Sequence, residues 1–357
     1  MTLTPEFLRT LPKVALHDHL DGGLRPQTVI DNCRDRGHKL PTTDPDELGL
    51  WFFDAADSGD LVTYLSTFTH TIAAMQTADH LQRVAREFVL DQAADGVIYA
   101  EARWAPEQHT QGGLTEAEAV EAVRDGLSAG MAEAAASGAT IIAQQLVTSM
   151  RHAEPTTRIA ELAVRYRDEG VAGFDIAGAE AGFPAANFAD AFSYLRHHNV
   201  CYTIHAGEAD GLSSIQQAVE LGGLRLGHGV RLVEDIRADG DAFELGALAA
   251  FVRDRRIALE VCPTSNLQTG IAATYGEHPV GLLRDLDFRV TISCDNRLMS
   301  RTTLSQEFGH LVEAFGWTLD DVDWCTTNAM LAAFLPWDER LRLIADVIAP
   351  AYVEAGR

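Results

Sequence analysis

Residues 14–19 read VALHDH, a run of strand-forming apolar residues that ends in two histidines. Seven more short apolar runs follow along the chain, each bounded by polar or turn-forming residues. They are VIYAEARW (97–104), TIIAQQLV (140–147), VAGFDIA (171–177), CYTIHA (201–206), LRLGHG (224–229), IALEVC (257–262) and FRVTISCD (288–295). Together these runs predict eight β-strands.

Amphipathic segments lie between the predicted strands. Examples are AELAVRYRDEG (160–170), SSIQQAVELGG (213–223) and DAFELGALAAFVRDRR (241–256), whose apolar residues recur at helical spacing. Strands that alternate with helices pair in parallel, and eight such units favour a closed (β/α)8 TIM barrel. An open doubly wound sheet would show a similar pattern. We expect one α/β domain that spans residues 1–357.

The interval between the first two predicted strands, residues 20–96, is much longer than a simple crossover. It predicts a helical insertion over roughly residues 30–95. One face of a helix there would carry four apolar side chains, those of Leu61, Tyr64, Leu65 and Phe68. This face suits a lid over the barrel mouth, but spacing alone favours packing on the core.

The composition limits the possible partners. Asp and Glu total 52 against 28 Lys and Arg, which gives a formal net charge of -24. Such a surface repels phosphate backbones and anionic lipids, so we expect neither nucleic acid nor a membrane as a partner. The five cysteines are odd in number and lack C-x-x-C spacing, which disfavours a disulfide framework. No signal-peptide or membrane-span pattern is visible, so we expect a cytoplasmic protein.

Polar residues end most of the predicted strands. In barrels of this kind, catalytic residues lie at the carboxyl ends of the strands. The residues found there are His17, His19, Glu101, Arg103, Asp175, His205, His228 and Asp295. So many metal-ligand residue types at one end of one barrel are hard to explain by packing alone.

A metal site accounts for four of these residues. His17 and His19 are two apart, so both imidazoles would point to the same side of the strand, although paired core histidines are the alternative. His205 adds a third nitrogen, and Asp295 adds a carboxylate oxygen. Three nitrogens and one oxygen suit zinc, and cobalt or iron can occupy the same set. Cys294 would face the opposite side of its strand, so we do not expect it to be a ligand.

Two further residues are candidates for the acid–base chemistry that metal-assisted hydrolysis requires. Glu208 follows His205 in the segment HAGE, where the glycine allows a sharp turn back over the site. A carboxyl group in that place can shuttle protons. His228 has glycines on both sides, and it can either orient a metal-bound hydroxide or serve as a structural histidine.

The motifs PKVALHDHLDG, YAEARWAPE, GFDIAGAE, HAGE, RLGHG, CPTSN and CDN occur in the order seen in adenosine deaminases. The chain resembles this family from about residue 12 to about residue 350. The resemblance implies one zinc ion per subunit, held by His17, His19, His205 and Asp295. It also implies a reaction, the hydrolytic deamination of adenosine and 2′-deoxyadenosine to inosine and 2′-deoxyinosine with release of ammonia.

The resemblance assigns a role to each remaining candidate. Glu208 is the acid that protonates N1 of the purine, and His228 holds the attacking hydroxide in place. The backbone amide of Gly178 binds N3, Asp21 contacts the ribose hydroxyls, and His19 belongs to the substrate site as well as to the metal. The family's apolar gate corresponds to Leu61, Tyr64, Leu65 and Phe68.

Two positions depart from the family pattern. Many members have two consecutive aspartates where this chain has Asp295 and Asn296. The second aspartate must be protonated to donate a hydrogen bond to N7 of the purine, whereas the Asn296 amide donates directly. We therefore expect purine recognition to survive. The second departure is Ala179, in GAE where GDE is common, and it has no predicted consequence.

Other functions compete with adenosine deamination. A deaminase of the same fold can act on free adenine, a 5′-modified adenosine or an aminodeoxyfutalosine-type compound. A barrel metallohydrolase of esters or lactams often bridges two metals with a modified lysine, but Lys13 and Lys39 are the only lysines in the chain. A non-catalytic binding protein would have no need to retain every ligand and Glu208. Cytidine-type deaminases are excluded, because their H-x-E and P-C-x-x-C signature is absent.

Overall fold

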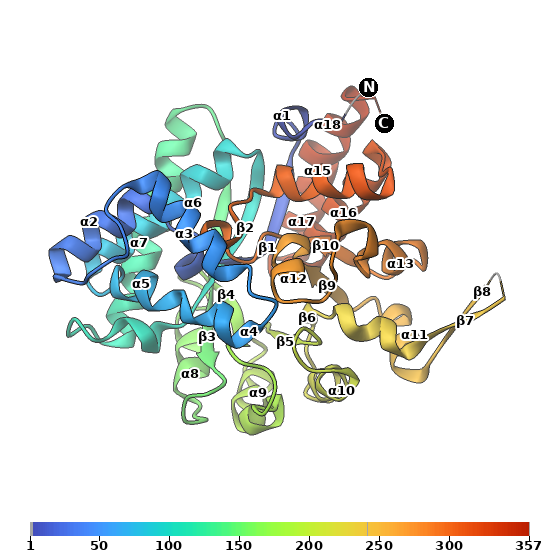
Figure 1. The fold of residues 1–357 in the computed structure, drawn as a ribbon, viewed down its shortest axis with the longest axis horizontal. Helices are drawn as coiled ribbons and strands as arrows, with labels where there is room; N and C mark the ends of the chain where they lie inside the picture. The colour runs from blue at the N-terminus through green and yellow to red at the C-terminus, as the bar shows by residue number, and fades with distance from the viewer. Residues whose placement is uncertain (1–2, 241, 357) are drawn as a thin grey trace.

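The computed structural model describes residues 3–240 and 242–356, and a parallel β-barrel lies at its centre (Figure 1). Four strands pair in parallel in the order β1-β2-β3-β4: β1 (Lys13–His19), β2 (Val97–Trp104), β3 (Ile142–Met150) and β4 (Val171–Ala177). Four more pair in parallel in the order β5-β6-β9-β10: β5 (Thr203–Ala206), β6 (Arg225–His228), β9 (Ala258–Val261) and β10 (Val290–Ile292). These eight strands correspond to the eight predicted ones.

Two single bridges join the two halves of the barrel. Phe174 on β4 pairs with Tyr202, just before β5, and Asp18 on β1 pairs with Asp295, just after β10. Both bridges are parallel, so the barrel strands all run in one direction. The structure confirms the predicted (β/α)8 TIM barrel and excludes the open doubly wound sheet.

Helices cover the outer face of the barrel (Figure 1). Between and after the strands lie α7 (Glu116–Ala136), α8 (Arg158–Arg165), α9 (Ala189–His197), α10 (Leu212–Glu220), α11 (Ala247–Asp254), α13 (Val280–Asp285), α15 (Leu304–Phe315) and α16 (Leu319–Ala332). The other α-helices outside the insertion are α1 (Pro5–Leu8), α12 (Pro263–Gln268), α14 (Arg297–Ser300), α17 (Trp337–Leu343) and α18 (Ala349–Glu354). The helices predicted over 160–170 and 213–223 correspond to α8 and α10.

The prediction of one helix over residues 241–256 is wrong in its first part. β7 (Ile236–Asp239) and β8 (Ala242–Leu245) form an antiparallel hairpin, and α11 begins only at Ala247. Gly240, with φ of +60°, allows the tight turn, and the extended backbone of Gly246 separates β8 from the helix. Figure 1 shows the hairpin projecting from the molecule beside α11. Asp241 of the predicted helix lies outside the described residues.

The insertion after β1 forms five helices. They are α2 (Pro26–Arg36), α3 (Pro45–Ala56), α4 (Leu61–Ser66), α5 (Phe68–Ala73) and α6 (Ala78–Ala94). The apolar face that was predicted on one helix is divided between α4 and α5. The division falls at Thr67, whose N–H bonds to the carbonyl of Tyr64 in a 3₁₀-type contact that interrupts the α-helical pattern.

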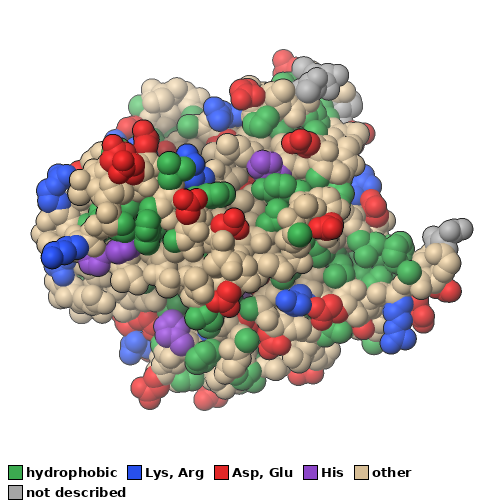
Figure 2. All heavy atoms as spheres, in the orientation of Figure 1, with side chains coloured by type: hydrophobic (Ala, Val, Ile, Leu, Met, Phe, Trp, Pro, Cys, Tyr) green, Lys and Arg blue, Asp and Glu red, His purple; other side chains and the backbone are tan. Residues whose placement is uncertain are grey.

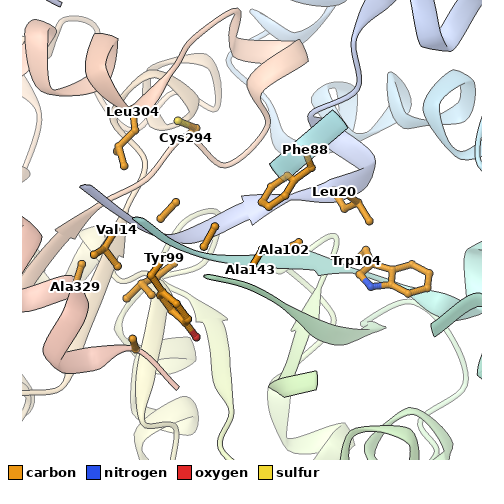
Figure 3. Packing of buried hydrophobic residues seen from close by; sticks show 14 of the residues in the cluster. Val14, Leu20, Phe88, Tyr99, Ala102, Trp104, Ala143, Cys294, Leu304 and Ala329 are labelled. Atoms are coloured by element: carbon orange, nitrogen blue, oxygen red, sulfur yellow. The ribbon is translucent and has the colours of Figure 1, made fainter. Parts of the chain in front are cut away.

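Apolar side chains of the strands pack outward against the surrounding helices. Figure 3 shows Val14 of β1 near Ala329 of α16, and Phe88 of α6 beside β1 and β2. All three side chains are buried. This packing leaves the polar side chains at the strand ends to meet at the carboxyl end of the barrel.

The surface is mainly acidic, as the net charge of -24 requires. Figure 2 shows Asp and Glu side chains spread over one face, with Lys and Arg side chains scattered among them. In the part of the chain that the structure describes, no helix is both long enough and apolar enough to cross a membrane.

Candidate active site

Three imidazole nitrogens and one carboxylate oxygen converge at the carboxyl end of the barrel. His17 and His19 lie at the end of β1, His205 lies on β5, and Asp295 follows β10. The Nε2 atoms of His19 and His205 are 3.4 Å apart. Asp295 Oδ1 lies 3.4 Å from His17 Nε2 and 3.3 Å from His19 Nε2. The structure therefore brings together all four residues that were predicted as metal ligands.

This arrangement fits a bound metal ion. Ligand bonds of about 2.1 Å at tetrahedral angles separate neighbouring ligand atoms by about 3.4 Å, which matches the observed spacing. His17 Nε2 is buried and has no hydrogen-bond partner. Burial lowers the pKa of His205 to about 4, so its imidazole is neutral and able to coordinate a cation.

Two buried carboxylates orient two of the three histidines that were predicted as ligands. Asp175 Oδ2 lies 2.8 Å from His205 Nδ1, and Glu260 Oε2 lies 3.0 Å from His17 Nδ1. In both His205 and His17, Nδ1 therefore faces a carboxylate, and Nε2 faces the predicted metal position. Arg103 donates hydrogen bonds to both carboxylates, at 2.8 Å to Asp175 and 2.7 Å to Glu260.

The same contacts keep the two carboxylates charged. Burial acts to raise the pKa of Asp175, but the nearby His205 and Arg103 outweigh it and bring this pKa down to about 2. Burial also opposes ionisation of Glu260, yet Arg103 and Arg225 hold its pKa well below the ordinary value. Both groups are anionic at neutral pH and can balance the charge of a divalent cation.

The residues that orient the histidines were only partly predicted from the sequence. Arg103 and Asp175 stood out as polar strand ends but received no role, and Glu260 was missed. Glu260 lies inside the apolar run IALEVC, and a charged residue inside a buried strand is almost always paired. That signal predicts the existence of a partner, but it does not identify the partner.

His228 and Asp295 both adopt a left-handed backbone conformation, with φ of 63° and 61°. Non-glycine residues rarely occupy this region, and those that do cluster at functional sites. The positive φ of His228 ends β6 at that residue, short of the predicted 224–229, whereas β10 already ends at Ile292, short of the predicted 288–295. Both side chains line a common pocket.

Glu208 lies beside His228 in this pocket. Glu208 Oε2 is 3.5 Å from His228 Nε2, and the Thr269 hydroxyl donates to Glu208 Oε1 at 3.1 Å. Burial, together with the charge of Asp295, raises the pKa of Glu208 well above its ordinary value. Burial lowers the pKa of His228 well below its ordinary value. These shifts favour a protonated Glu208 carboxyl group beside an uncharged His228 ring.

A second glutamate, Glu180, fixes the loop that carries Glu208. Its carboxylate accepts the backbone N–H groups of residues 207–210 and the hydroxyl of Ser214, at distances of 2.5–3.0 Å. The left-handed conformation of Gly207, with φ of 77°, helps four successive N–H groups to meet one anion. The sequence contained Glu180 in the motif GAE, but no role was predicted for it.

The pocket has a volume of about 240 Å³ and connects the metal position to the helices α4 and α5. Its lining includes His19, Asp21, Gly178, His205, Glu208, His228, Asp295 and Asn296, together with Leu61, Tyr64, Leu65 and Phe68. Of the predicted site residues, His17 is fully buried and lies outside this lining. Trp104, Met150 and His152 also line the pocket and were not predicted as site residues.

Asn296 lies against the loop that follows β1. A Cβ atom on Gly22 would be 1.8 Å from Asn296 Oδ1, so a side chain at Gly22 would displace Asn296. The glycine of the motif HLDG and the asparagine of CDN are therefore sterically coupled. Cys294 lies in the apolar core cluster, away from the metal position as predicted, and all five cysteines are free.

A family model described as adenosine deaminase matches residues 12–350 of the chain. The chain belongs to the adenosine deaminase family. Adenosine deaminase 1 of Streptomyces coelicolor is 58% identical to it, over 99% of this chain and 90% of that protein. The adenosine deaminase of Mycobacterium tuberculosis is 53% identical, over 99% of this chain and 98% of that protein. The family that the motifs predicted is thus confirmed.

Solved structures share the fold of this adenosine deaminase family member. An amidohydrolase from Burkholderia ambifaria with bound zinc has a TM-score of 0.84 at 24% identity, covering 99% of this chain and 94% of that one. An adenine deaminase from Arthrobacter aurescens has a TM-score of 0.79 at 21% identity, covering 97% and 98%. At these identities the likeness establishes the fold alone.

The contact between Asp175 and His205 generates a prediction about metal affinity. Asp175→Asn removes the charge that orients His205, so we expect the affinity for zinc to fall about 10- to 100-fold. Competition with a chelator measures this affinity. Asp168→Asn is the control, because the Asp168 side chain is 90% exposed and should not affect the metal. Equal zinc affinity for the wild type and Asp175→Asn would show that Asp175 does not support the ligand.

Proposed function

We propose that this chain is a zinc-dependent enzyme that hydrolyses the 6-amino group of adenosine and 2′-deoxyadenosine, releasing ammonia and inosine or 2′-deoxyinosine. One observation carries the proposal: four metal-ligand groups converge beside the buried acid Glu208. Relatives named adenosine deaminase, which are 53% and 58% identical over nearly the whole chain, support adenosine as the substrate. We also infer a cytoplasmic location, because free cysteines are typical of reducing compartments.

Two groups of side chains could each hold a metal ion: His17, His19 and His205, and His17, His228 and Asp295. We assign one zinc ion per subunit to His17, His19, His205 and Asp295, because Asp295 Oδ1 also lies 3.3 Å from His19 Nε2. A zinc ion in such a site makes water a competent nucleophile near neutral pH. Asp175 and Glu260 hold two of the histidine rings with Nε2 toward the ion. The Ser265 hydroxyl donates to Asp295 Oδ2 at 2.6 Å, which leaves Oδ1 for the metal.

Glu208 donates a proton to N1 of the purine in this mechanism. Burial and the nearby Asp295 raise its pKa, which favours the protonated form, and the Thr269 hydroxyl donates to one of its carboxyl oxygens. Protonation of N1 reduces the double-bond character of C6–N1 and makes C6 more electrophilic. His228 lies beside Glu208 and lines the same pocket, so it can donate a hydrogen bond to the attacking oxygen.

The other pocket residues define the substrate. We assign the backbone amide of Gly178 to N3, the side-chain amide of Asn296 to N7, and Asp21 with His19 to the ribose. We assign the role of an apolar gate, which excludes water from the reacting centre, to Leu61, Tyr64, Leu65 and Phe68. The pocket lining contains no Lys or Arg among the described residues, so a 5′-phosphate would lack a cationic partner.

A substrate panel tests the proposed function. We expect ammonia release from adenosine and 2′-deoxyadenosine, and kcat/KM at least about 100-fold lower for AMP and free adenine, because a phosphate lacks a partner and adenine lacks the ribose contacts. Metal analysis of the same sample should find about one zinc per chain. Efficient use of adenine or AMP, or a metal content near two per chain, would contradict the proposal.

The role of Glu208 as the proton donor generates a second prediction. Glu208→Gln keeps the shape of the side chain but removes the transferable proton, so kcat should fall about 10²- to 10⁴-fold with little change in KM. Steady-state kinetics measures both constants, and zinc content should stay at the wild-type level. Glu220→Gln on the exposed side of α10 is the matched control. Near-normal turnover of Glu208→Gln would remove Glu208 from the mechanism.

Asn296 generates a third prediction, on purine recognition. A 7-deaza analogue of adenosine cannot accept a hydrogen bond at the N7 position, so its binding should weaken by about 1 kcal/mol, or roughly fivefold. Inhibition or substrate constants for the two nucleosides measure this difference. Asn296→Ala should abolish the difference. Equal binding of both nucleosides to the wild type would show that Asn296 does not contact N7.

A further inference from the structure

A chain of hydrogen bonds connects a backbone amide to His228. The N–H of Val280 donates to His278 Nδ1 at 3.0 Å. His278 Nε2 lies 3.2 Å from Asn266 Oδ1, and Asn266 Nδ2 lies 3.1 Å from His228 Nδ1. The side chains of His278, Asn266 and His228 belong to residues that are at most 3% exposed, so water does not substitute for these contacts.

The first link sets the direction of the others. A backbone N–H can only donate, so His278 Nδ1 accepts and the proton of the neutral His278 ring is on Nε2. The Asn266 atom that faces His278 must then be an acceptor, which is the carbonyl oxygen. The amide nitrogen of Asn266 therefore faces His228 and donates to its Nδ1. A neutral imidazole that accepts at Nδ1 carries its proton on Nε2.

The protonated nitrogen of His228 is the one on the reaction side. His228 Nε2 lies 3.5 Å from Glu208 Oε2, and His228 lines the same pocket as His205 and Asp295. The tautomer of His228 thus decides whether a donor or a lone pair faces the attacking oxygen.

We propose that Asn266 and His278 are positioning residues that hold His228 in its neutral Nε2–H tautomer. The proposal rests on the function proposed above. A neutral Nε2–H donates a hydrogen bond to the attacking oxygen and has no lone pair on that nitrogen with which to take a proton from water. His228 therefore stabilises the oxygen and is not the general base of the reaction.

An isosteric change at Asn266 separates this role from simple packing. Asn266→Asp keeps the size of the side chain but cannot donate to His228 Nδ1 when it is ionised. Its carboxylate accepts from both histidines, so the His228 proton moves from Nε2 to Nδ1. We expect kcat to fall about 100-fold, as for loss of one preorganised donor, and KM to change by less than about threefold.

The matched control is Asn328→Asp on α16. Asn328 is also a buried amide, and its Nδ2 has no hydrogen-bond partner in the structure. The control therefore places the same carboxylate in the protein interior without removing a donor from His228. We expect its kcat to remain within about threefold of the wild type. An equal loss of kcat in the two variants would overturn the positioning role of Asn266.

A spectroscopic measurement reads the tautomer without turnover. Long-range ¹H–¹⁵N correlation spectra of the zinc-loaded enzyme, labelled with ¹⁵N in histidine, distinguish a protonated ring nitrogen from one with a lone pair. The His228 signals are assigned by their absence from His228→Gln. We expect a protonated Nε2 and a lone pair on Nδ1 in the wild type, and the reverse in Asn266→Asp.

The results of these experiments distinguish a wrong tautomer assignment from a wrong substrate assignment. A proton on Nδ1 in the wild type overturns the proposal, and so does a wild-type pattern that persists in Asn266→Asp. If Asn266→Asp does not fold, the wild-type spectrum alone shows which ring nitrogen of His228 carries the proton and so tests the proposal. Because the spectrum does not depend on the substrate, a wrong tautomer is distinguishable from a wrong assignment of adenosine, which the substrate panel tests.

Discussion

Arg103 lies between two buried carboxylates, and the proposed metal site depends on this interaction. It donates to Asp175 and Glu260, each of which orients one histidine through its Nδ1. Without the positive charge of Arg103, carboxylates that are buried this deeply would be protonated and would no longer orient the imidazoles. Buried ion pairs seldom stabilise a fold more than apolar residues of the same size would. The network of Arg103, Asp175 and Glu260 is therefore best explained as a support for the histidines of the proposed metal site.

Closure of the barrel completes the site. The bridge between Asp18 and Asp295 joins the first and last strands, and it places the carboxylate of Asp295 beside the two histidines of β1. An open sheet would keep these segments apart, although each motif would be unchanged. Glu208, the proposed proton donor, depends on a separate support, because the Glu180 carboxylate accepts hydrogen bonds from the N–H groups of the loop that carries Glu208. The predicted metal ligands and Glu208 are thus positioned by different parts of the chain.

Much of the fold and of the candidate site could be predicted from the sequence, because strand periodicity and ligand residue types are local properties. The eight barrel strands and the four metal-ligand candidates were found in this way. The partners of those residues were not, since the contact between Glu260 and His17 joins positions far apart in the sequence. The hairpin of β7 and β8 was missed because the residues of β8 were assigned to the helical pattern of 241–256. Asn266 and Glu180 lay within recognised motifs, but their roles depend on hydrogen-bond directions that only the three-dimensional structure reveals.

In the proposed mechanism four side chains bind one cation, and the position of that cation can be measured. In crystals of the zinc-loaded protein, anomalous scattering at the zinc absorption edge locates the metal without reference to activity. We expect one peak per chain, at about 2.0–2.2 Å from ligand atoms of His17, His19, His205 and Asp295. A peak elsewhere, two adjacent peaks, or no peak among these residues would show that these four side chains do not bind a single zinc ion.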